Sequence, residues 1–137
     1  MNSTTGEGCP FFVYGTLRQG FRNFIWVAKY VTRVAPATLQ GAEMYLVGPK
    51  GDFPAIVPGE GVVKGELLFI HPHKYKDAVK ILDYVESEGF LYKRELVEVE
   101  TGDGKKEAWA YFWINEGFLL HHKIQGNDWA LFKGGRA

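Results

Sequence analysis

The sequence predicts a single mixed α+β domain in which a curled or barrel-like sheet packs against one helix. Short β-prone apolar runs, separated by turn residues, lie on both sides of one segment with helical periodicity. The length of 137 residues fits one domain, and 46% hydrophobic with 23% charged residues is typical of a compact globule. We therefore expect residues 1–10 to form a flexible leader and residues 11–137 to form one domain.

Several runs of residues are predicted to be extended. The first, Phe11–Val13, is apolar and stops at the turn-like sequence Tyr14-Gly15-Thr16. The others are 37–47, 53–57, 62–70, 92–100 and 106–115. Turn residues at 48–52 and 58–61 separate the middle runs, and residues 101–104 form a good hairpin turn. The pattern of residues 19–34 predicts no element.

The last predicted strand is apolar on both faces. Its alternation places three large aromatic residues on one face, namely Trp109, Tyr111 and Trp113. The opposite face carries Ala108, Ala110, Phe112 and Ile114. We therefore expect this strand to be covered on both sides.

The one clear helical segment begins at Pro72 and stops by Gly89. Its apolar residues repeat at spacings of three and four: Tyr75, Ala78, Val79, Leu82 and Val85. At about 100° per residue, Glu86 falls roughly 40° from Leu82, inside this apolar stripe. Burial there, and the carbonyl end of the helix dipole, would raise the pKa of the Glu86 carboxyl toward that of a general base or acid near neutral pH.

Two structural interpretations of Glu86 remain open at this point. The helix could end by Val85, so that the Glu86 side chain turns into solvent. Alternatively, Glu86 could form an ion pair with a buried arginine such as Arg94. The periodicity alone does not decide between these and a catalytic role.

A second candidate site lies at the bend Tyr14-Gly15-Thr16-Leu17-Arg18. A glycine at the end of a buried strand allows the backbone to approach a ligand and to present consecutive N–H groups. Such groups suit a carboxylate or a developing oxyanion. A tight structural turn with no ligand explains the same pattern.

Taken together, these residues resemble the gamma-glutamylcyclotransferase-like family. The resemblance is carried by residues 14–18 with Gly20 and Asn23, by 53–58 with 63–66, and by Leu82-Asp83-Tyr84-Val85-Glu86 with Tyr92-Lys93-Arg94. These segments occur in order between about residue 11 and residue 115. The resemblance implies a small mixed β-barrel with a packed helix and a pocket between the bend and the glutamate.

The resemblance also implies residue roles. Tyr14, Gly15, Thr16 and Leu17 would hold the glutamyl head of a substrate, and Glu86 would be the catalytic carboxylate. Tyr92 would line the pocket with its hydroxyl. Arg94 and Tyr111 are weaker candidates, for which packing roles are equally compatible with the sequence.

Composition excludes several other classes of function. Lys plus Arg and Asp plus Glu each number 16, so the chain lacks the excess positive charge of a nonspecific nucleic-acid binder. The longest apolar run, 108–114, is too short to span a membrane. A lone cysteine, Cys9, excludes an internal disulfide, and with no secretory signal at the start we expect a cytoplasmic protein.

No cofactor is expected either. The histidines, His71, His73, His121 and His122, have no Cys or acidic ligands at metal-site spacing, so we predict no metal site. Residues 59–66 lack the Gly-Lys-Ser/Thr ending of a phosphate loop.

The predicted function is therefore release of 5-oxoproline from a small-molecule γ-glutamyl amine or γ-glutamyl amino acid, with Glu86 as general base and acid. The alternative is a noncatalytic protein that binds a small carboxylated metabolite in the same pocket. A purely structural interaction domain would need an exposed apolar patch, which no segment obviously supplies. The polar tail, residues 126–137, contains Trp129 and Phe132, which could dock on the domain or on a neighbouring chain; oligomeric state stays open.

Overall fold

A computed structural model of the protein describes residues 8–47, 53–114 and 123–133. Its strands are β1 (Phe11–Val13), β2 (Val31–Val47), β3 (Phe53–Ile70), β4 (Tyr92–Thr101) and β5 (Gly104–Trp113). Its helices are α1 (Tyr75–Val85) and the short α2 (Trp129–Phe132). Short 3-10 turns are η1 (Phe24–Trp26), η2 (Ala28–Tyr30), η3 (Pro72–Lys74) and η4 (Gln125–Asn127).

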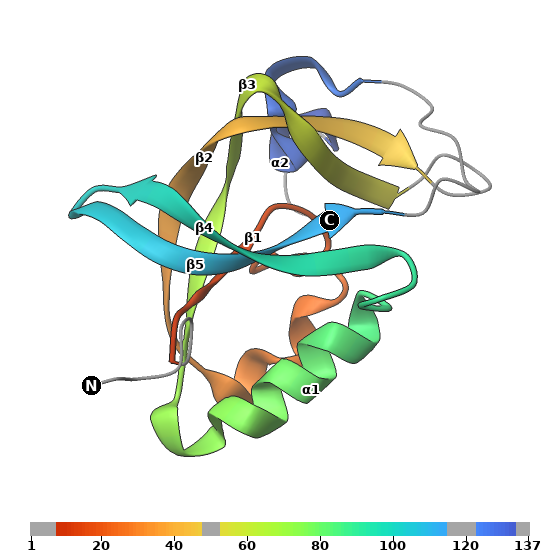
Figure 1. The fold of residues 1–137 in the computed structure, drawn as a ribbon. Coiled ribbons are helices and arrows are strands. Elements are labelled where there is room, and N and C mark those ends of the chain that lie inside the picture. Colours follow the sequence, from red (N-terminus) through yellow and green to blue (C-terminus); the bar gives the residue numbers. More distant parts are fainter. Residues whose placement is uncertain (1–7, 48–52, 115–122, 134–137) are drawn as a thin grey trace.

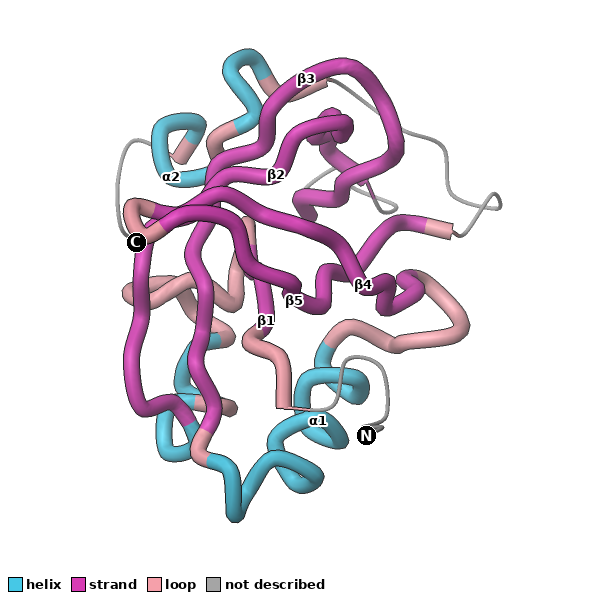
Figure 2. The backbone as a smooth tube through the Cα atoms, turned by 60° about the vertical axis from the view of Figure 1, so that its left-hand side comes forward, coloured by secondary structure: helices cyan, strands magenta, loops and turns pink. Residues whose placement is uncertain are grey.

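The strands close into a small barrel in the order β1-β3-β2-β4-β5. Antiparallel pairs make up most of the sheet, and parallel contacts of β1 and β3 with β5 complete the ring, through Phe11 opposite Trp109 and Ile56 opposite Phe112. Helix α1 lies below this barrel and α2 lies above it (Figure 1, Figure 2). The predicted fold class, a mixed β-barrel with a packed helix, is confirmed.

The two longest strands differ from the prediction. Strand β2 begins at Val31, six residues before the expected start, and β3 continues through the predicted turn at 58–61. The pairing of β2 with β3 instead shifts register between Gln40 and Ala42, around Gly41, whose φ is +88°. A bulge bends a strand without ending it, so the hairpin stays paired on both sides of this point.

The glycines of the expected turn have a packing role. A Cβ on Gly59 would lie 2.3 Å from Cγ of Glu43, and one on Gly61 would lie 2.7 Å from its Oε1. These glycines therefore let the Glu43 side chain lie across the neighbouring strand. Glycines in a strand can mark the close approach of a neighbouring group as well as a turn. The sequence pattern does not distinguish the two, which is why the predicted turn was wrong here.

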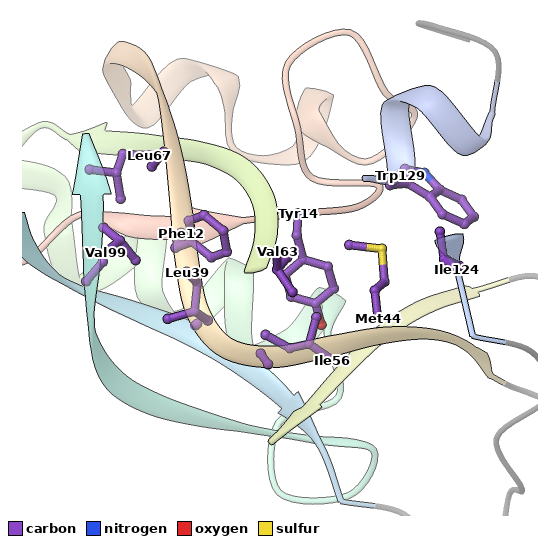
Figure 3. Close-up of a cluster of buried hydrophobic side chains, with 14 of the residues drawn as sticks. Phe12, Tyr14, Leu39, Met44, Ile56, Val63, Leu67, Val99, Ile124 and Trp129 are labelled. Atoms are coloured by element: carbon purple, nitrogen blue, oxygen red, sulfur yellow. The ribbon is translucent and has the colours of Figure 1, made fainter. Parts of the chain in front are cut away.

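Alternation along the strands divides the apolar residues into two layers. One layer fills the barrel, where Phe12, Leu39, Val63 and Val99 converge (Figure 3). The other lies between the barrel and α1 and includes Leu82. Strand β5 contributes to both layers: Ala108 and Ala110 point into the barrel, whereas Trp109, Tyr111 and Trp113 face α1. The prediction that this strand is covered on both faces is confirmed.

Helix α1 is shorter than predicted. Pro72 begins the 3-10 turn η3, and the α-helix itself runs only from Tyr75 to Val85. It ends in a Schellman motif, in which the Glu88 N–H donates to the Asp83 carbonyl at 2.9 Å and Ser87 has a φ of +50°. Ser87, and not Gly89, is therefore the left-handed residue that stops the helix.

The C-terminal segment docks on its own domain. Trp129 of α2 is buried in the barrel layer (Figure 3), and the half-exposed ring of Phe132 stacks on it. The sequence left this docking open. Elsewhere several large apolar side chains are exposed, which no sequence pattern indicated: Ile25, Trp26, Tyr84 and Phe90. None of the helices in the described ranges is long and apolar enough to cross a membrane.

Candidate active site

A cavity of about 160 Å³ opens between the end of β1 and the end of α1. All the site residues predicted from the sequence line it: Tyr14, Gly15, Thr16, Leu17, Glu86 and Tyr92. The remaining wall is largely apolar and was missed by sequence reasoning; it includes Phe53, Val85, Leu91 and Trp113. Because a cavity of roughly 150 Å³ holds a molecule the size of benzene, this one admits a small amino-acid head group.

Glu86 lines this cavity and comes directly after the last residue of α1. Its backbone N–H still donates to the Leu82 carbonyl, at 3.1 Å, so the helical geometry carries its side chain toward the apolar face. Its carboxylate has no hydrogen bond or ion pair with any described residue, and burial raises its pKa to about 7. Helix termination at Val85 was foreseen as one possibility, but the side chain does not turn away into solvent.

Two tyrosine hydroxyls near Glu86 are already committed elsewhere. The Tyr14 hydroxyl donates to the Tyr111 carbonyl and the Tyr92 hydroxyl donates to the Pro54 carbonyl, each at 2.8 Å. Burial raises the pKa of both hydroxyls well above its ordinary value, and the charge of nearby Glu86 raises it further. Both hydroxyls therefore stay protonated and donate to backbone, which explains why they do not stabilise the Glu86 carboxylate.

Tyr111 and Arg94 meet at a different carboxylate. Arg94 donates to both oxygens of Asp83, at 2.9 and 3.1 Å, and its guanidinium lies over the Trp109 ring. The Tyr111 hydroxyl donates to the same Asp83 at 2.6 Å, while the Tyr111 residue lines the cavity. Arg94 is therefore not the ion-pair partner of Glu86. Asp83, three residues before Glu86, could have been found from the motif, but nothing in the pattern showed its partners.

Three residues of the bend after β1, Gly15, Thr16 and Leu17, line the cavity. Arg18 N–H donates back to the Gly15 carbonyl at 3.0 Å, and the Asn23 side-chain amide donates to the Thr16 hydroxyl at 2.8 Å. By contrast, the N–H groups of Gly15, Thr16 and Leu17 have no acceptor among the residues that the structure describes. Since buried N–H groups are normally paired, these three are candidates for binding an anionic or carbonyl oxygen.

A buried charge network holds this bend against the barrel. The Arg18 guanidinium lies between Glu66 of β3, at 3.5 Å, and Asp128, at 3.3 Å. Glu66 also accepts from the backbone N–H of Gln19 at 2.9 Å, and Asp128 caps the start of α2. The network thus connects the bend to both β3 and the C-terminal helix. Sequence reasoning missed it, because its three charged residues are far apart in the chain.

The described residues contain no group of three or more His, Cys, Asp or Glu side chains that could hold a metal ion. His71 and His73 lie outside the candidate site, and the N–H of His73 donates to Nδ1 of His71 at 3.2 Å. His121 and His122 fall outside the described residues.

The closed sheet with its packed helix defines a small mixed β-barrel protein. Over residues 11–131 the sequence matches the gamma-glutamyl cyclotransferase, AIG2-like family. The chain therefore belongs to the gamma-glutamyl cyclotransferase, AIG2-like family.

Individual relatives are similar over most of the chain. A Vibrio cholerae protein whose name also refers to gamma-glutamylcyclotransferase is 29% identical over 118 residues, which cover 86% of this chain and 92% of that protein. The Escherichia coli gamma-glutamylcyclotransferase family protein YtfP is 28% identical over 120 residues, covering 86% and 93%. Among solved structures, YkqA from Bacillus subtilis superimposes with a TM-score of 0.69 at 26% identity; the match covers 91% of this chain but only 40% of YkqA.

Gly15→Ala should both destabilise the protein and narrow the cavity. A Cβ at Gly15 would lie 2.4 Å from Cγ of Pro54, another residue of the cavity wall, so one of them must move. Overpacking of this kind typically costs about 1–3 kcal/mol, which urea unfolding would measure. Gly102→Ala is the matched control, because a Cβ there meets no atom within 4 Å. Equal stability of the two variants would contradict the close packing of the bend on Pro54.

Proposed function

We propose that the protein is a γ-glutamyl cyclotransferase that releases 5-oxoproline from a γ-glutamyl amine or γ-glutamyl amino acid, without a metal or cofactor. One observation carries this proposal. Glu86, whose pKa is raised to about 7, lines the same small cavity as Gly15, Thr16 and Leu17. Neither its carboxylate nor the N–H groups of those three residues have a hydrogen-bond partner among the described residues. Family membership supports the same reaction.

Glu86 starts the reaction as general base. Its carboxylate takes one proton from the substrate α-ammonium, and the free amine attacks the γ-carbonyl carbon of the same molecule. Because the attack is intramolecular, the protein has to hold the glutamyl chain in a folded conformation and stabilise the charge that develops in the transition state. The N–H groups of the bend, residues 15–17, would bind the tetrahedral oxyanion or the substrate α-carboxylate.

Collapse of the intermediate completes the reaction. The C–N bond formed by the attack is kept in the five-membered ring, the oxyanion becomes the lactam carbonyl again, and the bond from the γ-carbon to the leaving nitrogen breaks. Protonated Glu86 gives its proton to the leaving nitrogen, and the second proton of the attacking nitrogen passes through the regenerated Glu86 carboxylate to the released amine. The products are therefore 5-oxoproline and the protonated amine, and no water is consumed. A pKa of about 7 suits both halves of this cycle, because the same group must accept and then donate a proton near neutral pH.

The direct test is turnover of a panel of γ-glutamyl compounds by the purified protein. We expect 5-oxoproline and the amine to appear in equal amounts, as measured by chromatography of the reaction mixture. Tight binding of a panel member with no 5-oxoproline would contradict the proposal and favour the noncatalytic binding protein. Absence of both binding and turnover across γ-glutamyl amines and γ-glutamyl amino acids would also overturn it.

The rate should depend on the ionisation of Glu86. Only its carboxylate form can accept the α-ammonium proton, so kcat/KM should fall about tenfold per pH unit below a pKa near 7. The profile is measured with the free enzyme at substrate concentrations well below KM. An acid limb centred near the ordinary glutamate value of 4.5 would show that the acting carboxylate is not desolvated.

A further inference from the structure

An exposed arginine lies at the mouth of the cavity. The guanidinium carbon of Arg22 is 5.6 Å from the centre of the Phe53 ring. Phe53 lines the cavity yet is 41% exposed, so its ring lies where the cavity meets solvent. Asn23, the next residue along the chain, lines the cavity as well. Arg22 is therefore at the rim, four residues after the end of the bend that contains Gly15, Thr16 and Leu17.

The guanidinium of Arg22 forms no ion pair within the described part of the chain. Arg18 pairs with Glu66 and Asp128, Arg94 with Asp83, and Arg33 with Asp103. Arg22, by contrast, has no carboxylate partner among these residues, and its contact is with an aromatic ring. A guanidinium that lies over a ring keeps its N–H donors available at the edge, in a geometry that matches both oxygens of a carboxylate.

The proposed reaction places one part of the substrate near this rim. The glutamyl head must lie inside, where its α-amine reaches Glu86, so the substituent on the leaving amine extends toward the mouth. Phe53, Leu91 and Trp113 contribute apolar surface to the wall of the cavity. The cationic group at the rim then favours a leaving group that carries a negative charge and disfavours one that carries a second ammonium group.

We infer that Arg22 is a specificity-determining residue that selects γ-glutamyl compounds whose leaving amine bears a carboxylate, namely γ-glutamyl amino acids, over γ-glutamyl alkylamines and over compounds with a cationic leaving group. This inference rests on the proposed function. It goes further in assigning the choice between the substrate classes to one side chain other than Glu86.

A matched pair of substrates isolates the contribution of the carboxylate. γ-Glutamyl-alanine and γ-glutamyl-alaninamide have nearly the same shape and differ in the charge at the leaving group. The wild-type protein should have the higher kcat/KM on γ-glutamyl-alanine. Arg22→Gln should lower kcat/KM on that substrate about 3- to 10-fold, mainly through KM, as expected for an exposed ion pair. On the alaninamide the variant should match the wild type, and high salt should weaken the wild-type preference.

Arg33→Gln is the control for loss of an exposed arginine. Its guanidinium also lies over a phenylalanine ring, 4.6 Å from the centre of Phe69, but Phe69 and Arg33 are not part of the cavity. This variant should keep the wild-type kcat/KM on both substrates. Equal wild-type rates on the two substrates would overturn the inference while leaving the proposed function intact. No turnover of either substrate would also overturn the inference, and it would overturn the proposed function only if γ-glutamyl amines gave no 5-oxoproline as well. An equal loss on both substrates in Arg22→Gln would place Arg22 on the glutamyl head and contradict the selection proposed.

Discussion

Glu86→Gln should lower turnover of γ-glutamyl substrates by at least 10²-fold. The substitution keeps the size and shape of the side chain but removes the group that accepts the α-ammonium proton and returns it to the leaving amine. Substrate binding should survive, because the proposed contacts to the glutamyl head come from the bend at residues 15–17. We therefore expect the loss in kcat, with a KM change of only a few-fold.

The control for this substitution is Asp77→Asn on the same helix. Asp77 is exposed in the first turn of α1 and is not part of the cavity wall, so its neutralisation should leave turnover within about twofold of the wild type. Both variants are compared by 5-oxoproline release at pH 8, where the carboxylate of Glu86 is ionised. A Glu86→Gln protein as active as the wild type would remove Glu86 from the mechanism and leave only a family likeness.

Local patterns predicted the parts of the fold that depend on neighbouring residues. The hairpin of β4 and β5 follows from the turn residues 101–104. The two-faced strand β5 and the apolar stripe of α1 follow from periods of two and of three to four residues. The continuity of β3 through 58–61 could not be predicted in this way. There the glycines respond to Glu43 on the adjacent strand, a contact that no pattern within β3 encodes.

In the candidate site, too, local geometry could be predicted from the sequence and long-range pairing could not. The position of Glu86 on the apolar stripe predicted a desolvated carboxylate, because helical geometry alone determines which face a side chain shares. The absence of a partner within the described residues could not be predicted, since it depends on Arg94 pairing with Asp83 and on Tyr14 and Tyr92 donating to backbone carbonyls. Such choices of partner are made across the sheet, between residues far apart in sequence.

The same carboxylate should make the folded protein less stable as pH rises. The folded-state pKa of Glu86, about 7, lies above its ordinary value of 4.5, so between these values the folded state binds more protons than the unfolded state. The contribution of Glu86 to the free energy of unfolding is therefore fully present below pH 4.5. It falls through this window and reaches its minimum above pH 7. At 1.36 kcal/mol per pKa unit, the loss is on the order of 2–4 kcal/mol.

Glu86→Gln removes this loss, since a neutral amide does not ionise on exposure to water. The variant should therefore unfold at a higher urea concentration than the wild type at pH 8, and at a similar one near pH 4.5. Comparing the difference between the two proteins at each pH cancels the titration of every other group. The ionised Glu86 carboxylate lowers the stability of the folded protein at pH 8, so Glu86→Gln should raise stability while it lowers activity.

Glu66 is a buried carboxylate that has partners, so Glu66→Gln provides the contrast to Glu86→Gln. Glu66 is paired with Arg18 and accepts from the backbone N–H of Gln19, so its neutralisation should lower the free energy of unfolding at pH 8, by about 1–3 kcal/mol. The two glutamate-to-glutamine changes thus have opposite expected signs, set by whether the structure provides a partner for the charge. If Glu86→Gln were no more stable than the wild type at pH 8, the Glu86 carboxylate would have to be solvated or paired in the folded protein. Without desolvation the pKa of Glu86 would not be raised, and the group would no longer suit general base catalysis near neutral pH.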